Sequence, residues 1–225
     1  MPHDHTIRSW TVLSLLLGAV CLLGLSPSAQ ADELRRVRET LQVKQLQVFG
    51  ASPPVPALGA ARLNRTRNAL WVTLHASDLA AHTAYTVWVA VFNRPDACTT
   101  NPGGEVRCGA PDLMLTPNLA SASAFNVGAF ITDGEGTANV SIDVRSGLPP
   151  DGAAVLFGEG GIINNGVQPG LRAGNGFGAE VHFIIREHGD LLPHAIADQL
   201  SAFNGGCPPN ACANAQVAEF PHVPE

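Results

Sequence analysis

The chain has 225 residues, with 13 basic side chains against 19 acidic ones and a formal net charge of −6. An acidic protein is a poor candidate for a nucleic-acid partner, because neutralising phosphates requires a basic face. The length suits one large domain, and no second long apolar run follows the first 31 residues.

Residues 1–31 have the features of a secretory signal peptide. Arg8 supplies a positive charge, an apolar run follows from Thr11 to Leu25, and Ala29-Gln30-Ala31 offers a small-x-small cleavage site. The run is shorter than the roughly 20 residues that a spanning helix needs, and a retained anchor is the alternative. We therefore expect a secreted or periplasmic protein that does not span the membrane after signal cleavage.

Residues 32–60 are expected to form an N-terminal arm before a β-sandwich domain over 61–225. Basic residues outnumber acidic ones by seven to three between Asp32 and Arg67, whereas beyond Arg67 the ratio is five to fifteen. Such an arm is either solvated or in contact with an anionic surface. Within it, the segment 34–48 is weakly amphipathic and fits a helix or a strand.

Seven segments have the alternating or β-branched patterns that are typical of strands. They cover residues 71–75, 85–92, 125–132, 137–144, 153–157, 179–186 and 213–220. The third and fourth flank Asp133-Gly134-Glu135-Gly136, and because glycine readily takes the positive φ of a tight turn, they predict a hairpin. A helix is expected over 193–203. The whole pattern predicts an all-β fold, an antiparallel immunoglobulin-like β-sandwich with long loops and at most one or two short helices.

The segment 85–92 (Tyr-Thr-Val-Trp-Val-Ala-Val-Phe) is apolar on both faces. A sheet face open to water would not normally carry both Trp88 and Phe92. We therefore expect the face to be covered by the loop 158–178 or by a second copy of the chain in a homodimer. Core packing and an aromatic binding cleft are the two interpretations of this face.

The segment Leu79-Ala-Ala-His-Thr-Ala-Tyr85-Thr-Val87 resembles the tyrosine corner of immunoglobulin-like and fibronectin type III domains. In that motif a tyrosine hydroxyl caps backbone groups where the chain crosses between sheets. The usual proline and glycine of the turn are absent, and Ala81 and His82 stand in their region. The resemblance implies an architecture and no activity.

Three further segments resemble an uncharacterised family of exported bacterial β-sandwich proteins. They are Tyr85-Thr-Val-Trp-Val-Ala-Val-Phe-Asn93, Glu180-Val-His-Phe-Ile-Ile-Arg-Glu-His-Gly189 and Phe203-Asn-Gly-Gly-Cys207. The likeness spans roughly residues 71–222 and implies an exported β-sandwich. It supplies no catalytic residues.

Four cysteines outside the leader form two short-range couples, Cys98 with Cys108 and Cys207 with Cys212. Export favours oxidation, and each couple lies in a loop rich in proline and glycine, so we predict two local disulfides. A zinc site is the alternative. Paired cysteines in structural zinc sites usually enclose two to four residues, and only the second couple has that spacing.

The segment 180–188 is the best candidate for a catalytic or metal site. Side chains alternate along a strand, which places Glu180, His182 and Arg186 on one face, with His188 and Asp190 shortly after. Imidazole and carboxylate groups can perform acid–base chemistry or bind a divalent metal. The candidate metal ligands are His182, His188 and Asp190. The structural alternative is that Glu180 pairs with an arginine while His182 makes one buried hydrogen bond.

The sequence therefore predicts a disulfide-stabilised, non-catalytic binding or structural module that needs no cofactor. Its partner would be a small molecule, a glycan or a protein. The competing hypothesis is a metal-dependent or acid–base enzyme that uses Glu180, His182, Arg186 and His188.

Overall fold

The computed structural model describes residues 40–147, 154–156 and 170–224. The chain divides into two compact units, Met1–Arg36 and Val37–Glu225. The first unit, with the expected signal peptide, lies outside the described residues, as do residues 157–169 of the glycine-rich loop. All described residues belong to the second unit.

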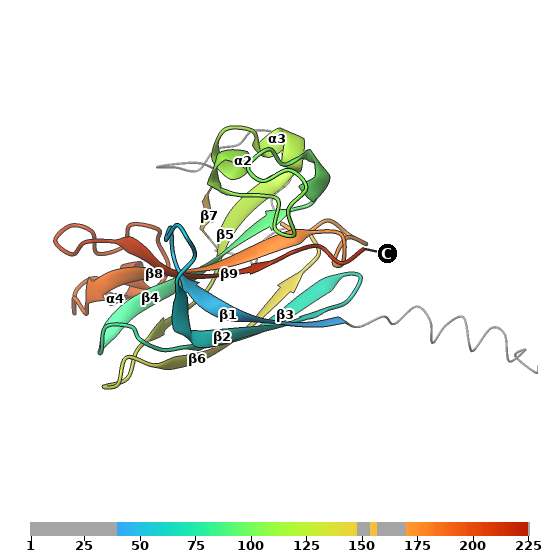
Figure 1. Ribbon diagram of the computed structural model, residues 1–225. Helices are drawn as coiled ribbons and strands as arrows, with labels where there is room; N and C mark the ends of the chain where they lie inside the picture. The colour runs from blue at the N-terminus through green and yellow to red at the C-terminus, as the bar shows by residue number, and fades with distance from the viewer. Residues whose placement is uncertain (1–39, 148–153, 157–169, 225) are drawn as a thin grey trace, which may run out of the picture. The chain divides into compact units, whose positions relative to one another are not determined.

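The described residues form mostly antiparallel β-structure (Figure 1). The strands are β1 (Thr40–Val48), β2 (Pro56–Arg65), β3 (Ala69–Ala76), β4 (Thr83–Phe92), β5 (Ala122–Ile131), β6 (Ala138–Arg145), β7 (Val155–Leu156), β8 (Glu180–Asp190) and β9 (Ala213–Phe220). Short helices lie in the loops: η1 (Pro95–Ala97), α2 (Ala110–Met114), α3 (Pro117–Ala120) and α4 (Ile196–Gln199). Each of the seven predicted strand segments overlaps an observed strand, and the helix predicted over 193–203 is reduced to α4.

The nine strands form one hydrogen-bonded sheet in the order β6-β3-β2-β1-β9-β8-β4-β5-β7, in place of the two sheets expected for a sandwich. The sheet curls so that strands from its two ends share one core. Val144 of β6 and Phe125 of β5 belong to the same buried cluster. β5 and β6 also approach each other closely across this core, because a Cβ placed on Gly128 of β5 would lie 3.7 Å from Ile142 Cγ1 of β6.

Part of the predicted N-terminal arm belongs to this sheet. From Thr40 onward it forms β1, which pairs with β2 on one side and with β9 on the other. The amphipathic segment 34–48 is thus a strand over its described residues. β2 is rich in alanine and glycine, which have low strand propensity. Packing explains Gly59, because a Cβ there would lie 2.6 Å from both His75 O and Leu46 Cδ1.

The hairpin predicted around residues 133–136 is wrong, although the tight turn itself forms. Gly136 N donates to Asp133 O within the turn. The flanking strands take different partners, since β5 pairs with β4 and β7, and β6 pairs with β3. Thr132 holds the end of β5 beside β4: its hydroxyl donates to Ala80 O and accepts from Thr83 N. The chain therefore crosses the core at this turn.

The tyrosine-corner contact forms at the turn before β4. Tyr85 is fully buried, and its hydroxyl accepts a hydrogen bond of 3.0 Å from Ala80 N. Burial, with a smaller effect from Glu187, raises the pKa of Tyr85 to about 12. His82 has φ 52°, in the left-handed region that favours glycine. The contact exists although the usual turn residues are absent.

All ten residues of β4 are buried. One face packs in the main core, and two loops cover the other, which we call the first disulfide loop (93–121) and the second disulfide loop (191–212). Phe92 lies in a cluster with Cys98 and Ala120 of the first loop. The Trp88 ring packs edge-on against Phe203 of the second loop, with 5.1 Å between centroids. The cover expected from loop 158–178 or a homodimer thus comes, in the described residues, from these loops.

Candidate functional site

The candidate site lies on the outer face of β8, where the two disulfide loops meet the sheet. Val181, Phe183 and Ile185 point into the core, as the alternation predicts. The cysteine couples form the predicted local disulfides, with Cα–Cα separations of 5.1 Å in the first loop and 5.9 Å in the second. Figure 1 shows the loop with α2 and α3 and the loop with α4 as separate projections from the sheet.

Glu180, at the start of β8, anchors the first disulfide loop. Its carboxylate is fully buried and accepts hydrogen bonds of 2.8 Å from the backbone N–H groups of Arg107 and Cys108. Burial alone would raise the pKa of Glu180. The hydrogen bonds from His182 and the two backbone groups outweigh burial and lower the pKa below its usual value.

His182 lies between two carboxylates. Its Nε2 is 2.9 Å from Glu180 Oε1, and its Nδ1 is 3.7 Å from Glu219 Oε1. The residue is 5% exposed, and its imidazole packs against the Phe92 ring. This arrangement matches the structural alternative for His182. The hydrogen-bond partners of Glu180, however, are two backbone N–H groups and a histidine, whereas its interaction with an arginine, Arg65, is electrostatic.

A second buried carboxylate holds the first disulfide loop from within. Asp112 is fully buried and accepts from the backbone N–H groups of Thr99, Thr100 and Gly109 and from both threonine hydroxyls. Burial would raise the pKa of Asp112, but these bonds lower it below its usual value. Sequence reasoning missed this residue, since an aspartate after Gly-Ala-Pro looks like an ordinary loop residue.

Beyond this framework, the tip of the first disulfide loop exposes large apolar side chains. Leu115 is 77% exposed, Leu119 53% and Met114 37%. They lie on or between α2 and α3. The exposed Arg94 stands beside them, since its guanidinium donates to Asn118 O. We call these three apolar residues the apolar tip.

Arg186, near the other end of β8, anchors the second disulfide loop. Its guanidinium donates to Phe203 O, Asn204 Oδ1 and Asn214 Oδ1 at 2.7–3.1 Å. It also lies 3.8 Å from the centroid of the Phe203 ring. All three hydrogen-bond acceptors are neutral, and burial lowers the pKa of Arg186.

His188 is fully buried in a chain of hydrogen bonds. The Trp88 indole N–H donates to Thr86 Oγ1, which lies 2.7 Å from His188 Nε2, and His188 Nδ1 lies 2.9 Å from Gly205 O. A carbonyl only accepts, so Nδ1 carries the proton and Nε2 accepts from the threonine hydroxyl. Burial is the main cause that lowers the pKa of His188. Cys212 Sγ lies 3.4 Å from the same Nδ1.

The predicted site residues therefore form two clusters and no single site. Glu180 and Arg186 are six positions apart on one strand, which corresponds to about 20 Å, and so are His182 and His188. The predicted metal ligands His182, His188 and Asp190 do not form a group among the described residues, where the one suitable cluster is His188 with Cys207 and Cys212.

A cavity of about 590 Å³ lies beside the first disulfide loop. Its lining includes Asn93, Asp96, Asn175 and His222. Asn93 and Asn175 bond to each other and to the backbone. His222 Nδ1 is buried and has no hydrogen-bond partner, and burial is the main cause that lowers the pKa of this histidine.

No family model, curated protein or solved structure matches this chain. Within the described part of the chain, no helix combines the length and the apolar character that crossing a bilayer requires.

Proposed function

We propose that the protein is an exported, non-catalytic binding module that docks onto a partner protein through the apolar tip (Met114, Leu115 and Leu119). The observation that carries this proposal is the exposure of three large apolar side chains on a loop that is otherwise fixed. Clustered apolar exposure is typical of interaction sites. The disulfides support export, because they persist in oxidising compartments.

The first disulfide loop is held before any partner arrives. The Cys98–Cys108 disulfide, the Asp112 hydrogen bonds and the Glu180 bonds to the backbone each restrict it. A loop that is already ordered loses little conformational entropy on binding, so more of the apolar contact energy becomes affinity. This is the arrangement expected of a recognition loop.

The charges favour a protein partner over an anionic membrane. Beyond Arg67 the chain carries five basic and fifteen acidic residues, a balance that anionic lipids repel. The exposed Arg94 lies beside the apolar tip. We infer that the partner offers an apolar groove with an acidic group at its rim.

The polar residues of β8 support a non-catalytic role. Glu180 and Arg186 use their hydrogen-bonding atoms to hold the two loops, and His188 is engaged through both ring nitrogens. The competing acid–base hypothesis requires such groups to face a substrate. The tyrosine-corner contact supports an immunoglobulin-like relationship as part of the same proposal, although the nine strands form one curled sheet in place of two.

Site-specific photo-crosslinking tests the proposed docking surface. A benzophenone amino acid at position 115 is expected to give a saturable crosslink in an envelope extract of the source cells. Excess unmodified protein should compete the product away, whereas the double variant L115S/L119S should not. The matched control carries the crosslinker at Ser141, which is exposed on β6.

Equal labelling from positions 115 and 141, or equal competition by L115S/L119S, would overturn the proposal. Co-sedimentation of the protein with anionic vesicles, lost in L115S/L119S, would assign the tip to a lipid surface and reject a protein partner.

A further inference from the structure

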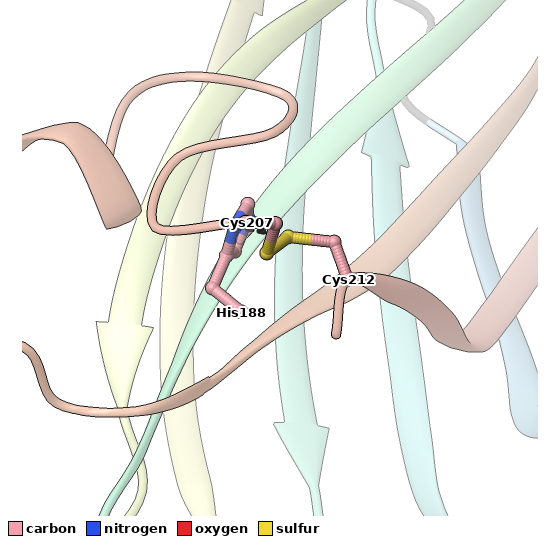
Figure 2. A group of neighbouring side chains, drawn as sticks. All are labelled: His188, Cys207 and Cys212. Atoms are coloured by element: carbon pink, nitrogen blue, oxygen red, sulfur yellow. Dashed lines mark hydrogen bonds between the residues drawn. A yellow bond between two sulfur atoms is a disulfide. The ribbon is translucent and has the colours of Figure 1, made fainter. Parts of the chain in front are cut away.

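A histidine lies directly beside the second disulfide, as Figure 2 shows. One ligand atom each from His188, Cys207 and Cys212 can be chosen so that all lie within 4.8 Å of one another. Cys212 Sγ lies 3.4 Å from His188 Nδ1.

We propose that Cys207, Cys212 and His188 form a metal site when their disulfide is reduced, and that a divalent ion with the preferences of zinc occupies it. Oxidation joins the two sulfurs and removes both thiolate ligands, so the disulfide is the metal-free state. The loop then has two cross-linked forms, one closed by the disulfide and one closed by a coordinated metal ion. This inference is independent of the proposed docking function.

The spacing of the ligand atoms suits tetrahedral coordination. Zn–S bonds of about 2.3 Å and Zn–N bonds of about 2.0–2.1 Å place sulfur and nitrogen about 3.6 Å apart, close to the observed separation of 3.4 Å. The two sulfurs would separate to about 3.8 Å, which is a local change because four residues lie between the cysteines. Water or Gly205 O, which lies 2.9 Å from His188 Nδ1, would fill the fourth position.

The outer hydrogen bonds of His188 can support this coordination. Metal binding at Nδ1 requires the ring proton to move to Nε2, which would then donate to Thr86 Oγ1, now 2.7 Å away. A hydroxyl oxygen can accept from both this N–H and the Trp88 indole, because it has two lone pairs. Ligating histidines commonly donate their second N–H in this way.

The local charges also balance. The guanidinium of Arg186 and the carboxylate of Asp198 both interact electrostatically with His188. The two thiolates themselves carry two negative charges, which a divalent cation neutralises.

The Cys207–Cys212 disulfide is more accessible to a reductant than the Cys98–Cys108 disulfide, and we expect it to be reduced first. Cys207 and Cys212 are partly exposed, whereas Cys98 and Cys108 are only 5% and 4% exposed. A dithiol reductant transfers two electrons and two protons to the disulfide, gives two thiols and becomes a disulfide itself. Metal binding then displaces the two thiol protons.

The test is a Co²⁺ and Zn²⁺ titration of the purified protein before and after mild reduction with a water-soluble phosphine, which is oxidised to its oxide. Reduced protein should bind one metal ion per chain and show thiolate-to-Co²⁺ absorption in the near ultraviolet. Oxidised protein should bind none. T86V should weaken metal binding by about 10–100-fold through the outer hydrogen bond.

Two cysteine variants form the matched controls. C207S/C212S should lose the metal, and C98S/C108S should retain it with unchanged stoichiometry. The proposal is overturned if reduced protein binds no stoichiometric metal, if C207S/C212S binds as tightly as the wild type, or if reduction abolishes the near-ultraviolet circular dichroism of the folded protein.

Discussion

At the scale of single residues, buried charges are used to hold loops. Glu180 and Arg186 both lie on β8, and each bonds to the backbone of one disulfide loop. A buried charge is costly unless hydrogen bonds compensate it. These residues were predicted as catalytic candidates because a sequence shows their chemistry but not their partners.

Glu180 provides the first prediction. In E180Q an amide NH₂ group must face a backbone N–H or His182 in place of an acceptor, so we expect a loss of about 2–3 kcal/mol in the free energy of unfolding. Urea denaturation measures it. The control E219Q changes a more exposed carboxylate next to the same histidine and should cost less than about 0.5 kcal/mol. Equal effects of the two variants would show that Glu180 is not the anchor.

His188 gives the protein a pH-dependent stability. Its pKa is lowered in the native state, so the unfolded chain binds a proton first as the pH falls below about 6.5. The stabilising contribution is complete above this pH and is lost as the pH falls through the native pKa. In H188Q the free energy of unfolding should lose this dependence on pH. The difference in unfolding free energy between the wild type and H188Q should therefore shrink as the pH falls from 7.5 to 5. A constant difference would contradict the assignment.

At the scale of elements, local motifs were predictable from the sequence, whereas the pairing partners of the strands were not. The tyrosine-corner contact joins Tyr85 to Ala80, which is only five residues away, so the spacing in the sequence was sufficient to predict the contact. The turn at 133–136 is equally local and also forms. The partners of β5 and β6, however, are β4 and β3, and no pattern within the turn identifies them.

Removal of the tyrosine hydroxyl tests the corner. Y85F keeps the ring, which stacks on Phe130 with 5.2 Å between centroids, and loses the bond from Ala80 N. We expect the free energy of unfolding to fall by about 0.5–1.5 kcal/mol, the usual net value of one hydrogen bond. Chemical denaturation measures the change. An unchanged midpoint would mean that water replaces the hydroxyl at no cost.

At the scale of the whole molecule, one arginine links segments that are far apart in sequence. Arg65 at the end of β2 is fully buried and donates to Gln42 on β1 and to four backbone carbonyls, those of Gly176, Ala179, Phe220 and Pro221. Burial lowers its pKa to about 10, although Glu180 acts in the opposite direction. Arg65 thereby ties β1 and β2 to the entry of β8 and the end of β9.

Substitution of Arg65 should loosen these segments together. In R65M several buried carbonyls lose their donor, and we expect a loss of about 3–5 kcal/mol in the free energy of unfolding, by analogy with breaking a buried charged network. Hydrogen exchange should increase at residues 176–180 and 218–221 in particular. R62M, at an exposed arginine of the same strand, is the control. A uniform increase across the sheet would argue against a specific link.

The sequence by itself determined the seven strand segments, the alternation of β8 and both disulfide couples. These features depend on local chemistry: β-branched patterns, period-two alternation and short loops between cysteines. Only the tertiary structure decided that one sheet forms, that the first and second disulfide loops cover Phe92 and Trp88, and that His188 lies beside Cys212. The reason is physical, because these contacts bring together residues whose separation along the chain says nothing about their distance in space.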